Sequence, residues 1–421
     1  PSAHAIIIVQ DNKAALYLFV QGRNEEMETW EGKRLGPEGA KQQFGAEEAF
    51  LYEEYESLAP KLLSGIEDIY CDYTNAAFEK YDKKLINTAI PYDQRGSSFS
   101  KATLNSLSPL LSELRLIKSS EELENLKRAC DITVEGHKSA MEFTKKDMYE
   151  YQIEAEMEKT FYDLGAERLG YPSIVASGDN ACILHYSTNR EKVDNNGLIL
   201  IDAAAEFKMY SSDVTRTFPV NGKFTKVQQD VYTEVLKAQE IGIKNVTTKK
   251  TMSDIHTSTV ASISQSLVDL GLVPMGVEET ISMMHYFEFF MHGTGHWLGL
   301  DVHDAGTTEE KNKPRKLKPG MVTTIEPGIY IRPNTPEIEF KLLERDPKKI
   351  RERRKSLGME KATKLESEEM KDAKSIKHKI PKDLLGIGIR IEDDIVCTEN
   401  DPINLTIGAP KTIDDVEAIC S

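Results

Sequence analysis

Cysteine and long apolar stretches are both scarce in this chain of 421 residues. Its five cysteines are widely spaced and form no CxxC pair. An odd number of isolated cysteines argues against a disulfide framework and a zinc–thiolate site, and it favours a reducing compartment. The longest uninterrupted apolar run, residues 14–20, is far shorter than a membrane span requires. An integral membrane protein is therefore excluded.

Positive charge is in deficit as well. The chain has 53 Lys and Arg against 69 Asp and Glu, which leaves a net charge of −16. A field of this sign repels phosphate backbones, so nucleic acid is not an expected partner. The apolar fraction of 39% is lean, but a chain of this length can still bury a large core. The length allows two or three domains, or one large catalytic unit with a companion.

The first residue is Pro1 rather than methionine, and no signal or transit pattern precedes the first apolar run. We expect the numbered chain to be a mature or truncated form from which any targeting segment has been removed.

The pattern of apolar residues predicts two domains of mixed α/β (α+β) class. Residues 5–9 and 14–20 are expected to be strands joined by a turn, and they open a small α/β domain over residues 1–115. Ser119 followed by Glu122 has capping-box spacing and predicts the start of a long amphipathic helix. This helix opens the second domain, residues 116–421. Further helices are expected around residues 149–164, 224–243 and 253–270.

Three strand-like segments of the second domain contain the polar residues of interest. They are residues 198–201, 321–331 and 387–397. In the last segment, isoleucines alternate with Gly388, Arg390 and Glu392. Because strand side chains alternate between faces, Arg390 and Glu392 are expected to share one face.

Residues 336–382 form a charged insertion between two of these strand-like segments. The insertion has 15 Lys and Arg against 10 Asp and Glu, so it is positive within an acidic chain. We interpret it as a solvated, partly mobile helical excursion. Contact with an anionic membrane or a partner is the alternative interpretation.

Four carboxylates and one imidazole stand out as candidate metal ligands. They are Asp202, Asp213, His296, Glu326 and Glu392. A hairpin could bring Asp202 and Asp213 face to face. The spacing of His292 and His296 resembles a zincin motif, but the intervening Gly-Thr-Gly supplies no glutamate and argues against a helix. Taken together, the five groups form an oxygen-rich set suited to two divalent ions that share a hydroxide.

These segments resemble the metallopeptidase superfamily of aminopeptidase P, prolidase and methionine aminopeptidase, which has the pita-bread fold. The matching segments are residues 200–203 (Leu-Ile-Asp-Ala), 212–225, 292–304, 324–330 (Thr-Ile-Glu-Pro-Gly-Ile-Tyr) and 388–394 (Gly-Ile-Arg-Ile-Glu-Asp-Asp). Residues 30–34 and 45–50 resemble the amino-terminal domain of aminopeptidase P. Residues 414–421 resemble the mitochondrial branch, the intermediate-cleaving peptidases, whose members trim one residue from presequence-processed proteins.

The resemblance implies a pita-bread metallo-aminopeptidase with two divalent ions, of the manganese type, held by the five residues above. It also implies roles in catalysis or substrate binding for a second group of residues, His185, His292, His303 and Arg390, with Glu326 as a proton shuttle. The implied partners are peptide or protein N-termini, and a homodimer is left open. The implied location is the mitochondrion, with the cytoplasm as the alternative. Two other functions are retained, namely prolidase and a silent, peptide-binding pseudo-peptidase.

Overall fold

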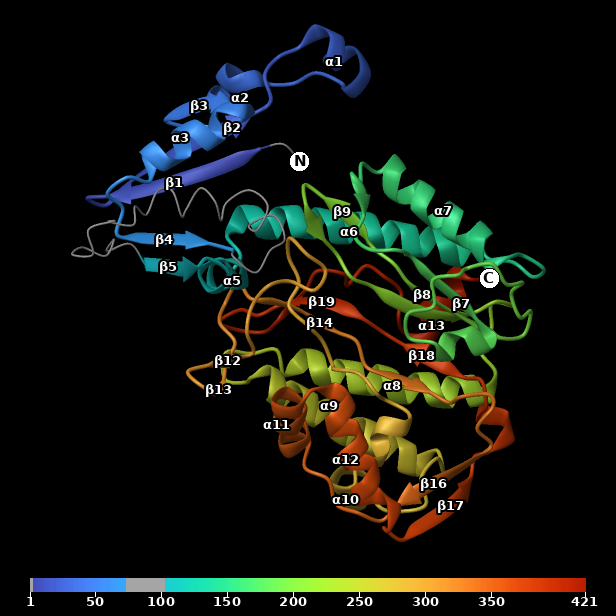
Figure 1. The fold of residues 1–421 in the computed structure, drawn as a ribbon. Helices are drawn as coiled ribbons and strands as arrows, with labels where there is room; N and C mark the ends of the chain where they lie inside the picture. The colour runs from blue at the N-terminus through green and yellow to red at the C-terminus, as the bar shows by residue number, and fades with distance from the viewer. Residues whose placement is uncertain (1–2, 73–102) are drawn as a thin grey trace. The chain divides into compact units, whose positions relative to one another are not determined.

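The computed structural model describes residues 3–72 and 103–421. These residues form two compact units, Pro1–Leu111 and Ser112–Ser421, and the predicted α/β class is confirmed (Figure 1). Helix α5 (Ser108–Leu116) contains both the junction of the units and the boundary that we predict after residue 115.

The first unit begins with the predicted hairpin of β1 (His4–Gln10) and β2 (Lys13–Val20). Asp11 and Asn12 form its turn with φ angles of 49° and 60°, which polar Asx residues tolerate well. Strand β3 (Glu48–Leu51) adds to β2 in parallel. The other elements are α1 (Glu25–Glu31), α2 (Gly36–Phe44), η1 (Tyr52–Glu54), α3 (Tyr55–Leu62), β4 (Asp68–Cys71) and β5 (Thr103–Ser106).

The second unit contains the four predicted helices and several more. The helices are α6 (Ser120–Phe143), α7 (Glu150–Asp163), η3 (Gly178–Cys182), α8 (Lys226–Lys244), α9 (Met252–Asp269), α10 (Val277–Ser282), η4 (His285–Glu288), α11 (Pro347–Leu357), α12 (Met359–Lys371), η5 (Lys382–Leu384) and α13 (Ile413–Ile419). The capping box at the start of α6 is confirmed, since Ser119 and Glu122 each accept a hydrogen bond from the other's backbone N–H.

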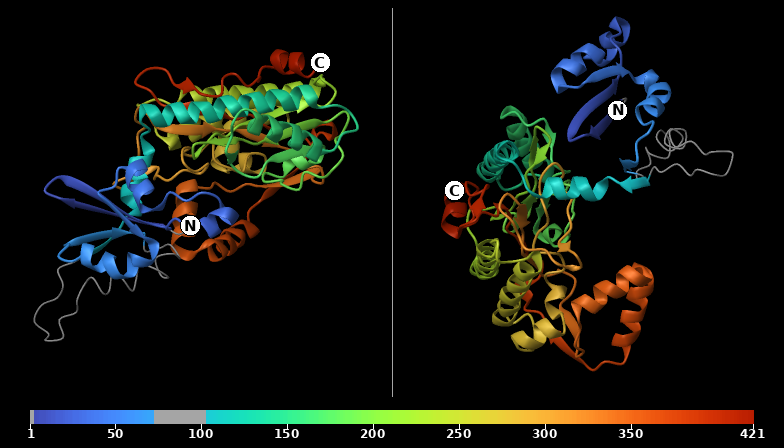
Figure 2. Two further views of the ribbon diagram at one scale, coloured as in Figure 1. Left: turned by 90° about the horizontal axis from the view of Figure 1, so that it is seen from above. Right: turned by 90° about the vertical axis from the view of Figure 1, so that its left-hand side faces the viewer.

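The strands of the second unit pair in antiparallel ladders. They are β6 (Arg168–Leu169), β7 (Ile174–Ser177), β8 (Leu198–Asp202), β9 (Ala205–Phe207), β10 (Tyr210–Ser211), β11 (Thr215–Pro219), β12 (Glu309–Glu310), β13 (Lys313–Pro314), β14 (Val322–Ile325), β15 (Gly328–Tyr330), β16 (Glu337–Lys341), β17 (Ser375–Lys379), β18 (Gly388–Arg390), β19 (Asp393–Val396) and β20 (Ile403–Asn404). Helices α6 and α8 lie on one side of the central strands, and α11 and α12 lie on the other (Figure 2).

Two of the predicted strands are each interrupted in the middle. The segment predicted over residues 321–331 forms β14 and β15, which are separated by Glu326 and Pro327. The segment predicted over residues 387–397 forms β18 and β19, which are separated by Ile391 and Glu392. Proline has no N–H to donate to a ladder, and this accounts for the first break. The two breaks face each other, because β14 pairs with β19 and β15 pairs with β18.

The charged insertion is helical, but our interpretation of it as a solvated excursion is wrong at its base. Its two ends form the hairpin of β16 and β17, and Ile338 and Phe340 of β16 are buried in the main hydrophobic core. Only the outer part is well solvated, since α11 has no buried residue and α12 buries Ala362 and Glu366 alone. The prediction used only the total charge of the insertion. It overlooked the alternation of apolar and acidic residues in β16, which is typical of a half-buried strand.

None of the described helices combines the length and the apolar character that crossing a bilayer would require.

Candidate active site

The two aspartates lie on the hairpin of β8 and β11. All of the apolar residues of β8 are buried, and the strand ends at Asp202, which is opposite Thr215 in the ladder. Asp213 lies just before β11, so the chain reversal brings both carboxylates to one end of the hairpin. The Tyr171 hydroxyl oxygen lies within hydrogen-bond distance of both of them, at Asp202 Oδ1 and at Asp213 Oδ1, and its single O–H can donate to either carboxylate. The face-to-face arrangement predicted for the two aspartates is therefore present.

His296 is positioned by a loop that runs along strand β14. The His296 N–H donates to Thr324 Oγ1 at 3.1 Å, and the Thr324 N–H donates to the His296 carbonyl at 3.0 Å. Gly295 permits this approach, because a Cβ atom there would lie 1.9 Å from the Thr324 carbonyl oxygen. The segment is not helical, as the Gly-Thr-Gly sequence predicts.

Glu326 and Glu392 occupy the two facing strand breaks. The Ile391 N–H donates to the Pro327 carbonyl at 3.3 Å, so the two breaks stay in register. The Glu392 N–H donates to the Thr215 carbonyl at 3.1 Å, which joins this break to strand β11. Each break therefore turns one glutamate toward the end of the hairpin that bears the aspartates.

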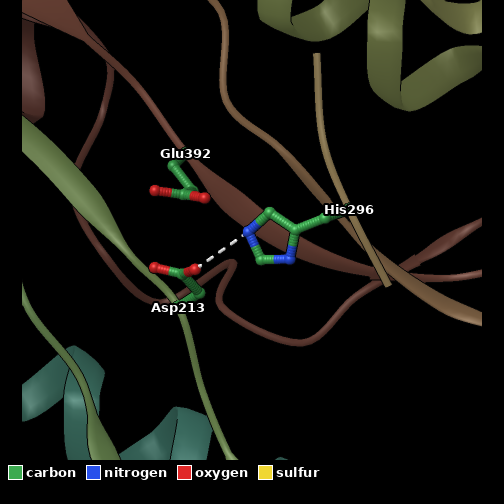
Figure 3. Close-up of side chains that lie close together, drawn as sticks. All are labelled: Asp213, His296 and Glu392. Carbon is green, nitrogen blue, oxygen red and sulfur yellow. Dashed lines mark ion pairs between the residues drawn. The ribbon is translucent and has the colours of Figure 1, made fainter. Parts of the chain in front are cut away.

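All nine residues predicted for the site line a single cavity of about 230 Å³. The nine are His185, Asp202, Asp213, His292, His296, His303, Glu326, Arg390 and Glu392, and Leu184 also lines the cavity. Asp213, His296 and Glu392 point toward one another (Figure 3), and one ligand atom from each lies within 4.8 Å of the others. His296 Nε2 is 3.3 Å from Asp213 Oδ2 and 3.7 Å from Glu326 Oε1.

Arg390 and Tyr330 form a hydrogen-bonded chain along another wall of the cavity. The Arg390 guanidinium donates to Asp202 Oδ2 at 2.6 Å and to the Tyr330 hydroxyl at 2.9 Å. His292 Nε2 is 2.9 Å from the same hydroxyl, and His292 Nδ1 is 3.4 Å from Glu326 Oε2. The Arg390 Nε–H donates to Thr215 Oγ1, whose hydroxyl donates to Glu392 at 2.7 Å. Arg390 thus contacts three neighbours in the site, Asp202, Tyr330 and Thr215.

His185 and His303 are each carried by a loop with a buried charge at its base. Glu150 is fully buried and accepts four hydrogen bonds from the loop that contains His185. The four donors are Ser177 N–H, Asn180 Nδ2, the Tyr186 hydroxyl and Glu191 N–H. Beside His303, the Asp304 carboxylate accepts from Lys118 Nζ at 3.0 Å, and both side chains are almost entirely buried.

Burial and crowding give the site unusual proton affinities. Burial raises the pKa of Glu326 to about 7, and burial with the charges of Asp213 and Glu326 raises the pKa of Glu392 well above its ordinary value. Burial alone would lower the pKa of His296, but its hydrogen bond with Asp213 and the nearby carboxylates raise it to about 9. Burial and the charge of Arg390 lower the pKa of His292 to about 3, so that imidazole is neutral.

These residues fit divalent metal ions. Four carboxylates around one cavity repel each other, and two cationic groups face them, Arg390 beside Asp202 and the His296 imidazole beside Asp213. A divalent cation would supply the missing positive charge, and carboxylate oxygens with one imidazole are ligands suited to hard or borderline metals. The geometry is compatible with metal binding at Asp213, His296 and Glu392.

Sequence reasoning missed three hydroxyl groups that hold the charged side chains. Tyr330 and Thr215 lie within the motifs that carry the resemblance, a few residues after Glu326 and Asp213. Their place in the sequence could therefore have identified them as site residues. Tyr171 lies in a loop far from any motif, and nothing in its local sequence marks it.

Comparisons with known proteins agree with this geometry. Residues 124–399 match metallopeptidase family M24, and residues 1–70 match the aminopeptidase P N-terminal domain. The Xaa-Pro aminopeptidase of Haemophilus influenzae is 35% identical over 99% of this chain and 84% of its own length. The intermediate cleaving peptidase 55 of Saccharomyces cerevisiae is 28% identical over 96% of this chain and 70% of its own length.

Among solved structures, the aminopeptidase PepP of Pseudomonas aeruginosa has a TM-score of 0.85 and 34% identity, over 100% of this chain and 86% of its own. The predicted order of an amino-terminal α/β domain and a pita-bread domain is thereby confirmed. The chain belongs to the aminopeptidase P family of the M24 metallopeptidases.

Proposed function

We propose that this protein is a dinuclear metal-dependent aminopeptidase that removes one N-terminal residue from peptides, with preference for a proline in second place. The observation that carries the proposal is the single cavity lined by all nine predicted residues. The proline preference is supported by the Haemophilus influenzae relative, an Xaa-Pro aminopeptidase.

The proposed ligands are Asp202, Asp213, His296, Glu326 and Glu392. Two divalent ions, when bound, would lower the pKa of a shared water and polarise the scissile carbonyl. Glu326 is the proposed proton shuttle, since its two oxygens lie 3.4 Å from His292 and 3.7 Å from His296, at the centre of the site. From this position it can hold a proton and return it to the leaving amine.

The remaining residues are proposed to orient the substrate and the ligands. His303 can donate a hydrogen bond to a substrate carbonyl oxygen that gains negative charge. Neutral His292 has a single N–H, which lies on the Gly293 carbonyl at 2.8 Å, so it is proposed to donate to the substrate after turning away from that carbonyl. Arg390 fixes the direction of the Asp202 carboxylate by a charge-assisted hydrogen bond. His185 is the proposed contact for the substrate backbone, on a loop that Glu150 holds in place.

Prolidase is the nearest alternative, and the occupation of Arg390 argues against it. A dipeptidase must bind a free carboxylate close to the reacting bond, usually with a dedicated cation. Arg390 is the arginine that lines the cavity, and its guanidinium is already engaged by Asp202, Tyr330 and Thr215. An aminopeptidase needs no such cation, because its substrate continues beyond the site.

The test is mass spectrometry of the products from three substrates under matched manganese. They are a peptide of about ten residues that begins Xaa-Pro, one that begins with tyrosine, and the dipeptide Gly-Pro. We expect loss of a single residue from the Xaa-Pro peptide. Cleavage of the dipeptide alone would identify a prolidase, and no cleavage by a metal-loaded preparation would identify a pseudo-peptidase.

Manganese, the mitochondrial location and a homodimer are further parts of this proposal. Similarity to the yeast intermediate cleaving peptidase supports the mitochondrial branch, although the bacterial relative is more similar, at 35% against 28% identity. Cleavage of the tyrosine-initiated peptide would support a role in trimming presequence-processed proteins. Elemental analysis of the native enzyme, cell fractionation and analytical ultracentrifugation test the metal, the compartment and the dimer respectively.

A further inference from the structure

Three exposed cations line one face of helix α11. Lys348, Arg351 and Lys355 are three and four residues apart, so they share one face of the helix, and all three are exposed. Within residues 3–72 and 103–421, their side chains have no ion pair or hydrogen bond. Of the other cations of α11, Arg353 and Arg354 pair with acidic residues of α12, each at 2.8 Å, whereas Lys349 is exposed on another face of the helix. We call Lys348, Arg351 and Lys355 the α11 basic stripe.

One residue of the α11 basic stripe, Arg351, acts electrostatically on a histidine behind the wall of the active site. Burial lowers the pKa of His256 in α9, and the charge of Arg351 lowers it further. His256 Nδ1 is 2.9 Å from Thr294 Oγ1, in the loop between the two site histidines. The Phe290 ring lies 6.0 Å from the His256 ring and 4.8 Å from that of His292. Through His256 and Phe290, the charge of Arg351 is thus linked to His292 in the wall of the cavity.

The insertion is also fixed to the body just before α11 begins. The Arg345 N–H donates to the Ser282 carbonyl, at the end of α10, at 2.7 Å. The His378 ring is 2.8 Å from the Gly271 carbonyl, just beyond α9. The stripe therefore has a defined place relative to the site.

The packing of α8 closes one side of the strands to a long substrate. Helix α8 packs against β15 and β18 through Val231, Val235 and Ala238, within the main core. No peptide can pass through this packed layer. Figure 2 shows α11 and α12 on the other side of the strands.

We propose that the α11 basic stripe binds acidic side chains in the part of a peptide substrate that follows the cleaved bond. The cavity is rich in carboxylates and suits the substrate's free amine, whereas the stripe offers the opposite charge to the substrate tail. Each exposed ion pair contributes little, but three cations on the side of the strands opposite α8 also raise the local concentration of an acidic chain. This inference rests on the proposed aminopeptidase function.

The test compares kcat/KM for peptides with the same Xaa-Pro start and tails rich in glutamate, glutamine or lysine. About ten residues allow an extended tail to reach roughly 30 Å from the cleaved bond. With the manganese-loaded full chain at low salt, we expect the glutamate tail to exceed the lysine tail roughly fivefold or more. The ratio should approach one in concentrated salt, which screens exposed charges.

Two triple variants distinguish the effect of the α11 basic stripe from the effect of the total charge of the insertion. K348Q/R351Q/K355Q should bring the ratio close to one, mainly through KM. K361Q/K364Q/K371Q removes the same charge from exposed positions of α12 and should keep the wild-type ratio. Equal ratios for the two variants, or a wild-type ratio of one, would overturn the proposal. A ratio compares two substrates of one preparation, so partial misfolding of a variant does not change its meaning.

Two further outcomes distinguish a failure of the proposed aminopeptidase function from a failure of the inference about the stripe. If the wild type cleaves no Xaa-Pro peptide of any tail, the proposed function fails; if it cleaves all tails equally, only this inference fails. Sedimentation with vesicles of phosphatidylserine and phosphatidylcholine tests the membrane alternative. Vesicle binding that is lost in K348Q/R351Q/K355Q, combined with no tail preference, would assign the stripe to a lipid surface instead.

Discussion

Arg390 sets the balance of charge in the cavity. It neutralises Asp202 at 2.6 Å and reaches Glu392 through the Thr215 hydroxyl. Burial raises the pKa of Asp213, as it does for the two glutamates, so the pocket is a poor place for further negative charge without added cations. This excess of carboxylates over cationic side chains is the reason to expect metal binding.

We predict that Asp213→Asn and Glu392→Gln will lose metal and activity together. Each change removes a negatively charged oxygen from the group whose ligand atoms lie within 4.8 Å of one another. Elemental analysis of the purified variants gives the metal content, and peptide cleavage gives the activity. Full activity in a metal-free preparation would contradict the assignment.

His303 offers the complementary test. Its ring meets that of His296 edge-on, with the centroids 4.3 Å apart, yet we place it outside the ligand set. His303→Ala should lower kcat by about 10²–10³, the usual cost of one lost transition-state hydrogen bond, with unchanged metal content. If this variant loses metal instead, His303 is a ligand.

At the scale of elements, the site depends on interruptions of regular structure. Glu326 and Glu392 point inward because two paired strands break at the same level. A sequence pattern shows a run of apolar and β-branched residues, and it cannot show that the run bends where its partner bends. The proposed ligands could therefore be selected from motifs, whereas the breaks that orient Glu326 and Glu392 could not be predicted.

The limits of prediction differ between contacts inside a motif and contacts between distant segments. The capping box of α6 and the turn of the first hairpin depend on residues a few positions apart, and both were predicted. Tyr171 reaches Asp202 and Asp213 from 31 and 42 residues away, and no local pattern reports such a contact. The base of the insertion was misjudged for a similar reason, since Phe340 meets its core neighbours only in the folded chain.

The insertion should therefore respond differently to two deletions. Replacing residues 344–372 by a short Gly-containing bridge should preserve the fold and metal binding, because the β16–β17 hairpin remains. Removing residues 336–382 also takes Ile338 and Phe340 out of the core, and loss of one such aromatic typically costs about 3–5 kcal/mol. Urea unfolding would compare the two chains. Equal stability of both deletions would show that the hairpin contributes nothing to the core.

At the scale of the molecule, a buried ionic cluster joins the pieces of the catalytic unit. Asp393 accepts hydrogen bonds from Arg216 in β11, Gln239 in α8 and Lys411 near the C-terminus. Burial opposes ionisation of Asp393, but the charges of Arg216 and Lys411 prevail and hold its pKa well below the usual range. Removing one partner of such a pair leaves a buried charge uncompensated, which is strongly destabilising. Strand β19, which begins directly after Glu392, is thus tied to three other segments.

Acid should destabilise the whole molecule partly through His137. This residue of α6 is fully buried, and its Nε2 lies 2.9 Å from the Ala203 carbonyl, just after Asp202. Burial, with a smaller effect of the Arg216 charge, lowers the pKa of His137 from 6.5 to about 4. The folded state therefore resists taking up a proton that the unfolded chain accepts below pH 6.5. The resulting stabilisation is present above pH 6.5 and is lost as the pH falls toward 4.

The shift corresponds to about 3 kcal/mol at most, from roughly 1.4 kcal/mol per pKa unit. Urea unfolding at pH 7, 5.5 and 4 would compare the wild type with His137→Gln, whose amide can still donate to the Ala203 carbonyl but does not titrate. We expect the variant to be less stable at pH 7 and to lose less free energy of unfolding between pH 6.5 and 4. Both proteins share every other titrating group, so the difference between their slopes isolates His137. Identical slopes would mean that the unfolded chain gains no extra proton at this position, and burial of the imidazole would then have no part in the acid sensitivity of the fold.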